Sequence, residues 1–143
     1  MSAKSRQRTR GLLVKALYQW QLAGHDYDEL VAQYSELAEY ARIDQVYFRD
    51  MLRRVLDDVE SLDALIAQLA VRKLDQLDAV GRAILLLALA ELKTRPDIPT
   101  RVVINEAVEL AKRFGATDSF KFVNAVLDKA AKEVLGRDGA SAG

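Results

Sequence analysis

The sequence predicts an all-α protein: a compact bundle of about seven helices, arranged as two helical subdomains packed together, with no sheet. Apolar residues recur at spacings of three and four along most of the 143 residues, as on the buried stripe of a helix. No segment alternates apolar and polar residues as a half-buried strand does. The connections between the periodic segments are short, which favours a compact bundle.

Length and composition indicate one domain. We expect a flexible basic N-terminus over residues 1–5, a single helical domain over 6–135 and a disordered tail over 136–143. Half of the residues are apolar and 29% are charged, as in ordinary globular proteins. The longest apolar run, residues 83–90, is too short to span a membrane, and residues 1–25 lack the apolar core of a secretory signal. We therefore predict a cytoplasmic protein.

The first helix is predicted over residues 6–22, with Gly24 ending it. Leu13, Leu17 and Trp20 share its apolar stripe. The opposite side carries Lys15, Tyr18 and Leu22, with Arg8 nearby. This second face is either covered by another helix or is an interaction surface, and the pattern favours neither.

Arginines concentrate at the start of the chain. Arg6, Arg8 and Arg10 are spaced by two, so they do not share one helical face. Some of them are expected in an arm that follows a phosphate backbone, although a solubilising tail has the same composition. The formal net charge is zero, so a phosphate ligand would be attracted locally rather than by the whole molecule.

The middle of the chain predicts further helices. Asp26 and Glu29 resemble a capping box that opens the second helix, and periodic segments follow over 30–41, 46–59 and 61–69. Residues 72–78 form a polar connector. Residues 79–92 are apolar nearly all round from Ala83, which predicts the central packing helix.

Residues 102–129 predict two helices joined by a tight turn. Gly115 is expected in the left-handed conformation that ends a helix, and Thr117, Asp118 or Ser119 as the cap of the next. Phe122 lies about 100° from the apolar stripe of the second helix, beside Lys129, with Lys121 further round. An aromatic ring among lysines suits stacking on a nucleic-acid base, but a ring at the margin of the core gives the same pattern.

Catalysis has little support in the sequence. There is no cysteine, so disulfides and thiolate chemistry are excluded. The single histidine, His25, lies in a predicted turn, and no phosphate-binding loop or zinc-protease motif is present. We therefore predict no enzymatic activity, no catalytic residue, no metal and no cofactor.

The run INEAVELAKRFGATDSFKFVNAVLDK resembles the signature of the NusB transcription antitermination family. The segments ALYQWQL and YFRDML resemble other parts of the same family, so the resemblance extends from Arg6 to Lys132. It implies an all-helical protein that binds the boxA element of RNA from ribosomal RNA operons. It further implies binding together with NusE, a small-subunit ribosomal protein, in an antitermination complex on RNA polymerase.

The resemblance also implies site residues. The RNA-binding set combines the residues that match the family with lysines that the pattern places beside them: Arg6, Arg8, Arg10, Lys15, Tyr18, Lys121, Phe122 and Lys129. The partner-binding set is Leu22, Arg82 and Asp118.

Three positions depart from the family pattern. An acidic residue is common at the position of Gly81, a basic one at Leu86 and a tyrosine at Ala90. These departures put in question the partner contacts made through the central helix.

Two other interpretations remain open. A similar helical domain precedes the catalytic domain of ribosomal RNA cytosine methyltransferases, and this chain would then be a fragment. Alternatively, the chain is a helical scaffold that binds only proteins. A homodimer is also possible. The basic and aromatic residues of the first and last helices form one RNA site only if those helices lie close together.

Overall fold

The computed structural model describes residues 2–70 and 77–137, which form seven α-helices and no strand. The predicted all-α fold is therefore confirmed. The helices are α1 (Ala3–Ala23), α2 (Tyr27–Ser35), α3 (Gln45–Asp57), α4 (Val59–Leu69), α5 (Ala79–Thr94), α6 (Thr100–Phe114) and α7 (Ser119–Lys129). A 3-10 helix, η1 (Ala38–Arg42), precedes α3, and a π-helical segment, η3 (Ala130–Val134), follows α7.

Helix α5 is the centre of the molecule, as its sequence predicts. Its residues 83–92 are all buried. Helices α1, α3, α4, α6 and α7 pack around it. A helix that is apolar on every side is stable only when other helices cover all of those sides.

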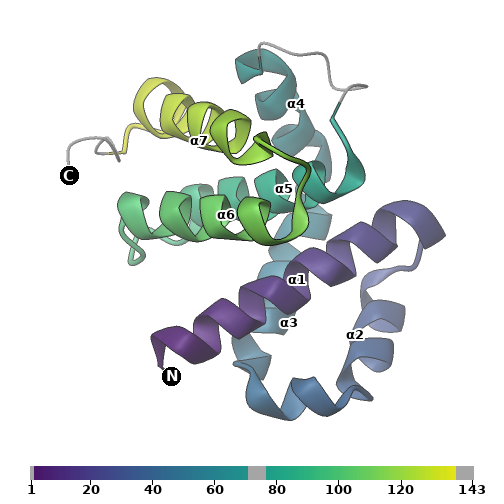
Figure 1. Cartoon of the computed structure of the whole chain (residues 1–143). Helices are drawn as coiled ribbons and strands as arrows, with labels where there is room; N and C mark the ends of the chain where they lie inside the picture. Colours follow the sequence, from purple (N-terminus) through teal and green to yellow (C-terminus); the bar gives the residue numbers. More distant parts are fainter. Residues whose placement is uncertain (1, 71–76, 138–143) are drawn as a thin grey trace.

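The helices form two groups (Figure 1). Helices α1, α2 and α3 occupy one half of the molecule, and α4, α6 and α7 gather around α5 in the other. Helix α6 lies between α1 and α7. The first helix thus packs mainly on α3 and α5, and the last on α5 and α6, rather than on each other.

Helix α1 begins earlier than predicted. The Ser2 hydroxyl accepts a hydrogen bond from the Ser5 N–H at 3.1 Å, so residues 3–5, expected to be flexible, form its first turn. Its end is as predicted. Gly24 has a φ of 71°, and its N–H donates to the Trp20 carbonyl at 3.0 Å.

The capping box that opens α2 is confirmed. The Glu29 N–H donates to the Asp26 carboxylate at 2.9 Å, and the Asp26 N–H donates to the Glu29 carboxylate at 3.1 Å. The expected connector at 72–78 lies outside the described residues except for Leu77 and Asp78.

The turn between α6 and α7 differs from the prediction. Gly115 is extended, with a φ of −86°, and the left-handed residue is Asp118, with a φ of 65°. Gly115 is required for a different reason: a Cβ there would overlap the Ser119 hydroxyl and come within 2.7 Å of the Ala111 carbonyl oxygen. Asp118 holds the N-cap position of α7, but its side chain makes no cap hydrogen bond.

The C-terminal end of the described chain is tied to the middle. The Arg137 guanidinium donates to the carbonyls of Leu92, Ile98 and Arg95 at 2.9, 2.8 and 2.7 Å. It also reaches the Thr100 hydroxyl at 3.2 Å. These bonds satisfy acceptors at the end of α5 and in the α5–α6 connection. Arg137 falls in the stretch expected to be disordered, of which residues 138–143 lie outside the described residues.

Candidate nucleic-acid interface

Helix α1 presents two chemically different sides. Arg8, Lys15, Tyr18 and Leu22 are exposed, the last two by 39% and 66% of their surface. The Arg8 side chain forms no hydrogen bond or ion pair with any other described residue, and the Lys15 side chain has only an ion pair with the exposed Glu39 at 3.9 Å. An ion pair in solvent contributes little and exchanges readily, so these cations are available to a ligand.

The other side of α1 holds what we term the inner cluster: Arg6, Arg10, Tyr47 and Glu91. Arg10 is only 3% exposed, and its Nε donates to both carboxylate oxygens of Glu91 at 3.0 and 3.2 Å. The Tyr47 hydroxyl donates a short hydrogen bond to the same carboxylate. The Arg6 guanidinium lies 3.8 Å from the centroid of the Tyr47 ring and 3.6 Å from the Asp44 carboxylate.

The inner cluster corrects one part of the predicted RNA site. Arg10 is buried and neutralised by Glu91, because an unpaired charge in the interior would be strongly destabilising, and it cannot reach an RNA phosphate. Arg6 is partly exposed but already stacked and paired. Of the three arginines, Arg8 is the one in solvent. Burial, followed by the charge of Glu91 and the hydrogen bond to it, raises the pKa of Tyr47 above its usual value.

A groove of about 440 Å³ runs beside the exposed side of α1. It brings together Lys15, Tyr18 and Leu22 from α1, Val80 from α5 and Phe114 from α6. Its walls are mainly apolar, with a lysine and a tyrosine at the edge. That composition suits a protein side chain or a stacked base.

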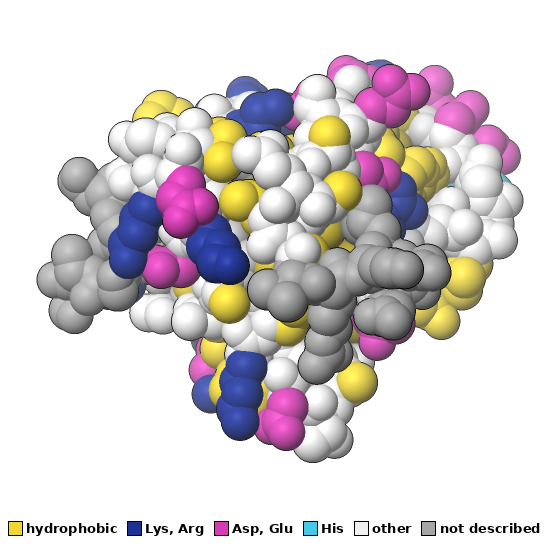
Figure 2. All heavy atoms as spheres, turned by 90° about the horizontal axis from the view of Figure 1, so that it is seen from above, with side chains coloured by type: hydrophobic (Ala, Val, Ile, Leu, Met, Phe, Trp, Pro, Cys, Tyr) yellow, Lys and Arg dark blue, Asp and Glu magenta, His cyan; other side chains and the backbone are white. Residues whose placement is uncertain are grey.

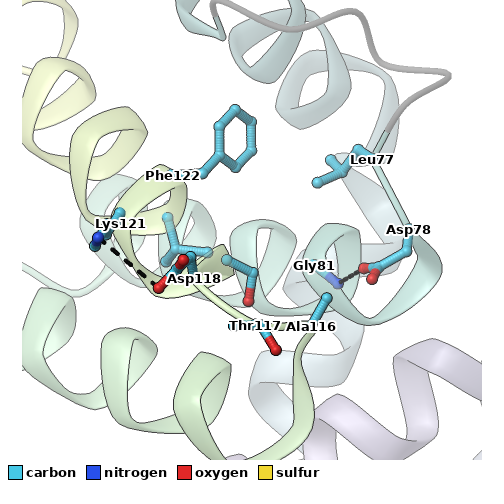
Figure 3. Close-up of a pocket in the computed structure, with 10 residues that line it drawn as sticks. Leu77, Asp78, Gly81, Ala116, Thr117, Asp118, Lys121 and Phe122 are labelled. Atoms are coloured by element: carbon cyan, nitrogen blue, oxygen red, sulfur yellow. Dashed lines mark hydrogen bonds and ion pairs between the residues drawn. The ribbon is translucent and has the colours of Figure 1, made fainter.

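A second pocket, of about 460 Å³, lies between the start of α5 and the start of α7. Phe122 and Leu77 line it from facing sides, and Gly81 and Thr117 lie below them in the view of Figure 3. The Lys121 ammonium lies 3.8 Å from the Asp118 carboxylate, and both side chains are mostly exposed. Phe122 is half-buried and packs against the core, as a ring at the margin of the core does.

The remaining predicted residues differ in whether they are available to a ligand. Lys129 is exposed on α7. Arg82 instead faces α4, where it forms a two-point ion pair with Asp63 at 2.6 and 3.0 Å and lies 5.3 Å from the Trp20 ring. A partner contact by Arg82 would compete with that pair.

The three departures from the family pattern also differ in position. Leu86 and Ala90 are 0% and 2% exposed, so the changes at these two positions lie in the core. Gly81, in contrast, lines the Phe122 pocket. Only the departure at Gly81 therefore alters a surface on which a ligand could lie.

The two pockets are neighbours although α1 and α7 are not packed together. Val80 lines the groove and Gly81 lines the pocket, so consecutive residues of α5 separate them. Likewise, at the end of α6, Phe114 lines the groove and Ala116 lines the pocket. The start of α5 and the α6–α7 turn therefore connect the Tyr18 side to the Phe122 side.

Three residues of this region were not predicted from the sequence: Lys112, Arg113 and Phe120. The Lys112 ammonium lies 5.0 Å from the centroid of the Phe120 ring, and the Arg113 guanidinium lies 4.8 Å from that of Phe114. The signal in the sequence was the run Lys112-Arg113-Phe114, in which two cations precede an aromatic ring. We term this region the outer surface; it comprises the exposed Arg8, Lys15, Tyr18, Lys112, Arg113 and Lys121 and the half-buried Phe122.

Charge is unevenly distributed over the molecule. Figure 2 shows Asp and Glu side chains gathered at one end of the face that it draws. The first turn of α2, which follows His25, contributes Asp28 and Glu29, with Asp26 as its cap. This end repels phosphate, so a nucleic acid is favoured elsewhere.

The described residues lack metal-ligand groups and membrane-spanning helices. No group of three or more potential metal-ligating side chains occurs in residues 2–70 and 77–137. No helix in those ranges is long and apolar enough to cross a membrane.

Known proteins resemble this chain over nearly its whole length. Residues 7–132 match the NusB family. The transcription antitermination protein NusB of Alcanivorax borkumensis is 47% identical over 130 residues, which cover 91% of this chain and 87% of that protein. The NusB of Yersinia enterocolitica is 47% identical over 137 residues, covering 96% of this chain and 99% of that protein.

Solved structures agree. A NusB structure from T. maritima superposes with a TM-score of 0.78 at 36% identity, covering 90% of this chain and 91% of that one. A structure of the antitermination factors NusB and NusE in complex with double-stranded RNA gives a TM-score of 0.70 at 25% identity, covering 92% and 98%. Together with the shared helical core, these matches show that the chain belongs to the NusB family of transcription antitermination proteins, which are not enzymes.

Proposed function

We propose that this antitermination factor binds the boxA element of RNA from ribosomal RNA operons through its outer surface. The observation that carries the proposal is the gathering of exposed cations and aromatic rings from α1, α6 and α7 around the start of α5. Single-stranded RNA is recognised by stacking its bases on such rings while cations hold its phosphates. The similar structure of NusB and NusE in complex with double-stranded RNA supports RNA binding as such and NusE as the partner.

Within this proposal the residues have distinct roles. Phe122 and Tyr18 stack on bases, and Arg8, Lys15, Lys121 and Lys129 bind phosphates. Arg6 lies against the Tyr47 ring and is partly exposed, so it contributes less positive potential to the RNA site than these four residues do. Asp118 limits the positive potential at Lys121, to which it lies 3.8 Å, and so tunes affinity.

NusE is the proposed protein partner, and the groove beside α1 is its docking site. Leu22 is the most exposed large apolar side chain that lines this groove. Burying it against a partner would remove apolar surface from water, which stabilises a complex. Asp118 and the neighbourhood of Gly81 form the edge of this contact. The complex of protein, RNA and NusE then joins RNA polymerase in the cytoplasm. A homodimer that hides the outer surface is excluded while RNA is bound.

A titration tests the function. The protein, with and without NusE, is titrated with an RNA that contains boxA and with a scrambled RNA of equal length and composition. We expect tighter binding of the boxA RNA, a further gain with NusE, and affinity that falls as salt increases. Equal binding to both RNAs would contradict the proposed function, and binding to neither RNA while NusE still binds would identify a protein-only scaffold.

Sedimentation of the protein alone and with the RNA tests the oligomeric part of the proposal. We expect one protein chain per RNA in the complex. A stable dimer that persists with RNA bound would contradict the single outer surface proposed here.

A further inference from the structure

Among the described residues, Arg113 is a cation with no carboxylate partner, at the place where α6 passes α1. It is exposed, and within the described ranges its one ring contact is with Phe114, 4.8 Å away. The nearby Lys112, by comparison, lies 3.7 Å from Glu109. An arginine held against a ring but without an anion has its charge available to a ligand.

Gly11 places Arg113 close to α1. A Cβ built on Gly11 would lie 4.0 Å from an Nη atom of Arg113, in ordinary van der Waals contact, so the end of the Arg113 side chain lies beside α1 at this position. Gly11 is buried, and the side of α1 on which it lies faces α6. A positively charged group therefore lies next to this position.

The orientation of α6 confirms which side Arg113 occupies. Gln7 of α1 donates to the Glu106 carboxylate of α6 at 3.1 Å, so Glu106 faces α1. Arg113 follows Glu106 by seven residues, which returns it to within about 20° of the same face. On α1, Gly11 lies between Arg8 and Lys15, so Arg113 fills the interval between these two cations.

We propose that Arg113 binds an RNA phosphate and joins the α1 cations to the Lys121–Phe122 region, making one continuous track. This inference rests on the proposed RNA-binding function. The track runs from Arg8 past Arg113 to Lys15 and Tyr18, and across the adjoining pockets to Lys121 and Phe122. It explains how α1 and α7, which pack mainly on other helices, serve one strand. The occupant is a phosphodiester of bound RNA, because a guanidinium recognises phosphate oxygens through paired N–H donors.

The test compares two variants of α6. Arg113→Gln removes the proposed contact, and Arg101→Gln removes an exposed arginine about 140° from the Glu106 face. Both change net charge equally. We expect Arg113→Gln to weaken binding of the boxA RNA and to reduce the slope of log affinity against log salt by about 0.7, the value for one phosphate of a single strand. Arg101→Gln should leave that slope unchanged.

Gly11 provides a second, independent variant. Gly11→Glu places a carboxylate beside the Arg113 guanidinium and should reduce the salt slope as Arg113→Gln does. Gly11→Ala, whose Cβ fits at contact distance, should preserve RNA binding. Thermal unfolding of all four variants verifies that they fold.

The outcomes separate this inference from the function itself. If the unaltered protein does not prefer boxA RNA, the proposed function fails. If it does, and Arg113→Gln matches Arg101→Gln in affinity and salt slope, then Arg113 does not bind RNA and the inference alone is overturned.

Discussion

The inner cluster and the outer surface contain the same residue types in opposite environments. In the inner cluster Arg10 is 3% exposed and bonded to Glu91, whereas on the outer surface Arg8, two residues earlier, is exposed and has no acid partner in the described chain. Two residues along a helix correspond to a rotation of about 200°, so neighbours in a run of arginines face opposite ways. Such a run therefore combines a structural charge and a binding charge.

The largest expected effect breaks the inner cluster. Glu91→Ala leaves Arg10 charged and buried without its partner, so the free energy of unfolding should fall by about 3–5 kcal/mol. Urea denaturation measures this loss. The matched change on the other side, Arg8→Ala, should stay within about 0.5 kcal/mol. Equal losses for the two variants would remove the distinction between the two regions.

The next largest effect tests the role of Phe122 on the outer surface. Phe122→Ala should weaken RNA binding by about 1–3 kcal/mol, the usual range for a base stacked on an aromatic side chain. Fluorescence titration gives the affinity, and thermal unfolding gives the stability. Since Phe122 is only half-buried, the stability should change less than for a core phenylalanine such as Phe48. A loss of stability as large as that of Phe48→Ala, with RNA affinity intact, would assign Phe122 to the core.

The smallest effect concerns pH and returns to the inner cluster. The pKa of Tyr47 is raised in the folded protein from an ordinary value of 10.0, so above pH 10 only the unfolded chain loses the proton. The contribution of the protonated Tyr47 hydroxyl to the free energy of unfolding is therefore complete below pH 10 and is lost as the pH rises above it. Denaturation at pH 8 and 10.5 should show the wild type losing stability relative to Tyr47→Phe, by less than about 1 kcal/mol. A constant difference would mean that the Tyr47 hydroxyl titrates normally.

Helix periodicity predicted most of the fold. The central position of α5, the capping box at Asp26 and the end of α1 at Gly24 were all predicted, because each depends on residues within about one helical turn. The start of α1 was placed three residues too late because the cap, Ser2, was not recognised. The conformation of Gly115 was wrong because its requirement is the approach of Ser119 and Ala111, which sequence spacing does not reveal.

The site was harder to predict than the fold. Lys15, Tyr18, Lys121 and Phe122 lie around two adjoining pockets, but Arg10 does not, because its partner Glu91 is 81 residues away in the sequence. Arg113 was missed for the same reason. Its neighbour Gly11 belongs to another helix, and no local pattern indicates that the two meet.

The bonds made by Arg137 have a consequence for the order in which the protein acquires its structure during synthesis. The acceptors that Arg137 satisfies at Leu92 and Thr100 precede it by 45 and 37 residues. A ribosome adds about 5–20 residues per second, so the end of α5 remains without this donor for several seconds after its own synthesis. During that interval water must satisfy these acceptors, and the α5–α6 connection reaches its final hydrogen bonding among the last parts of the chain.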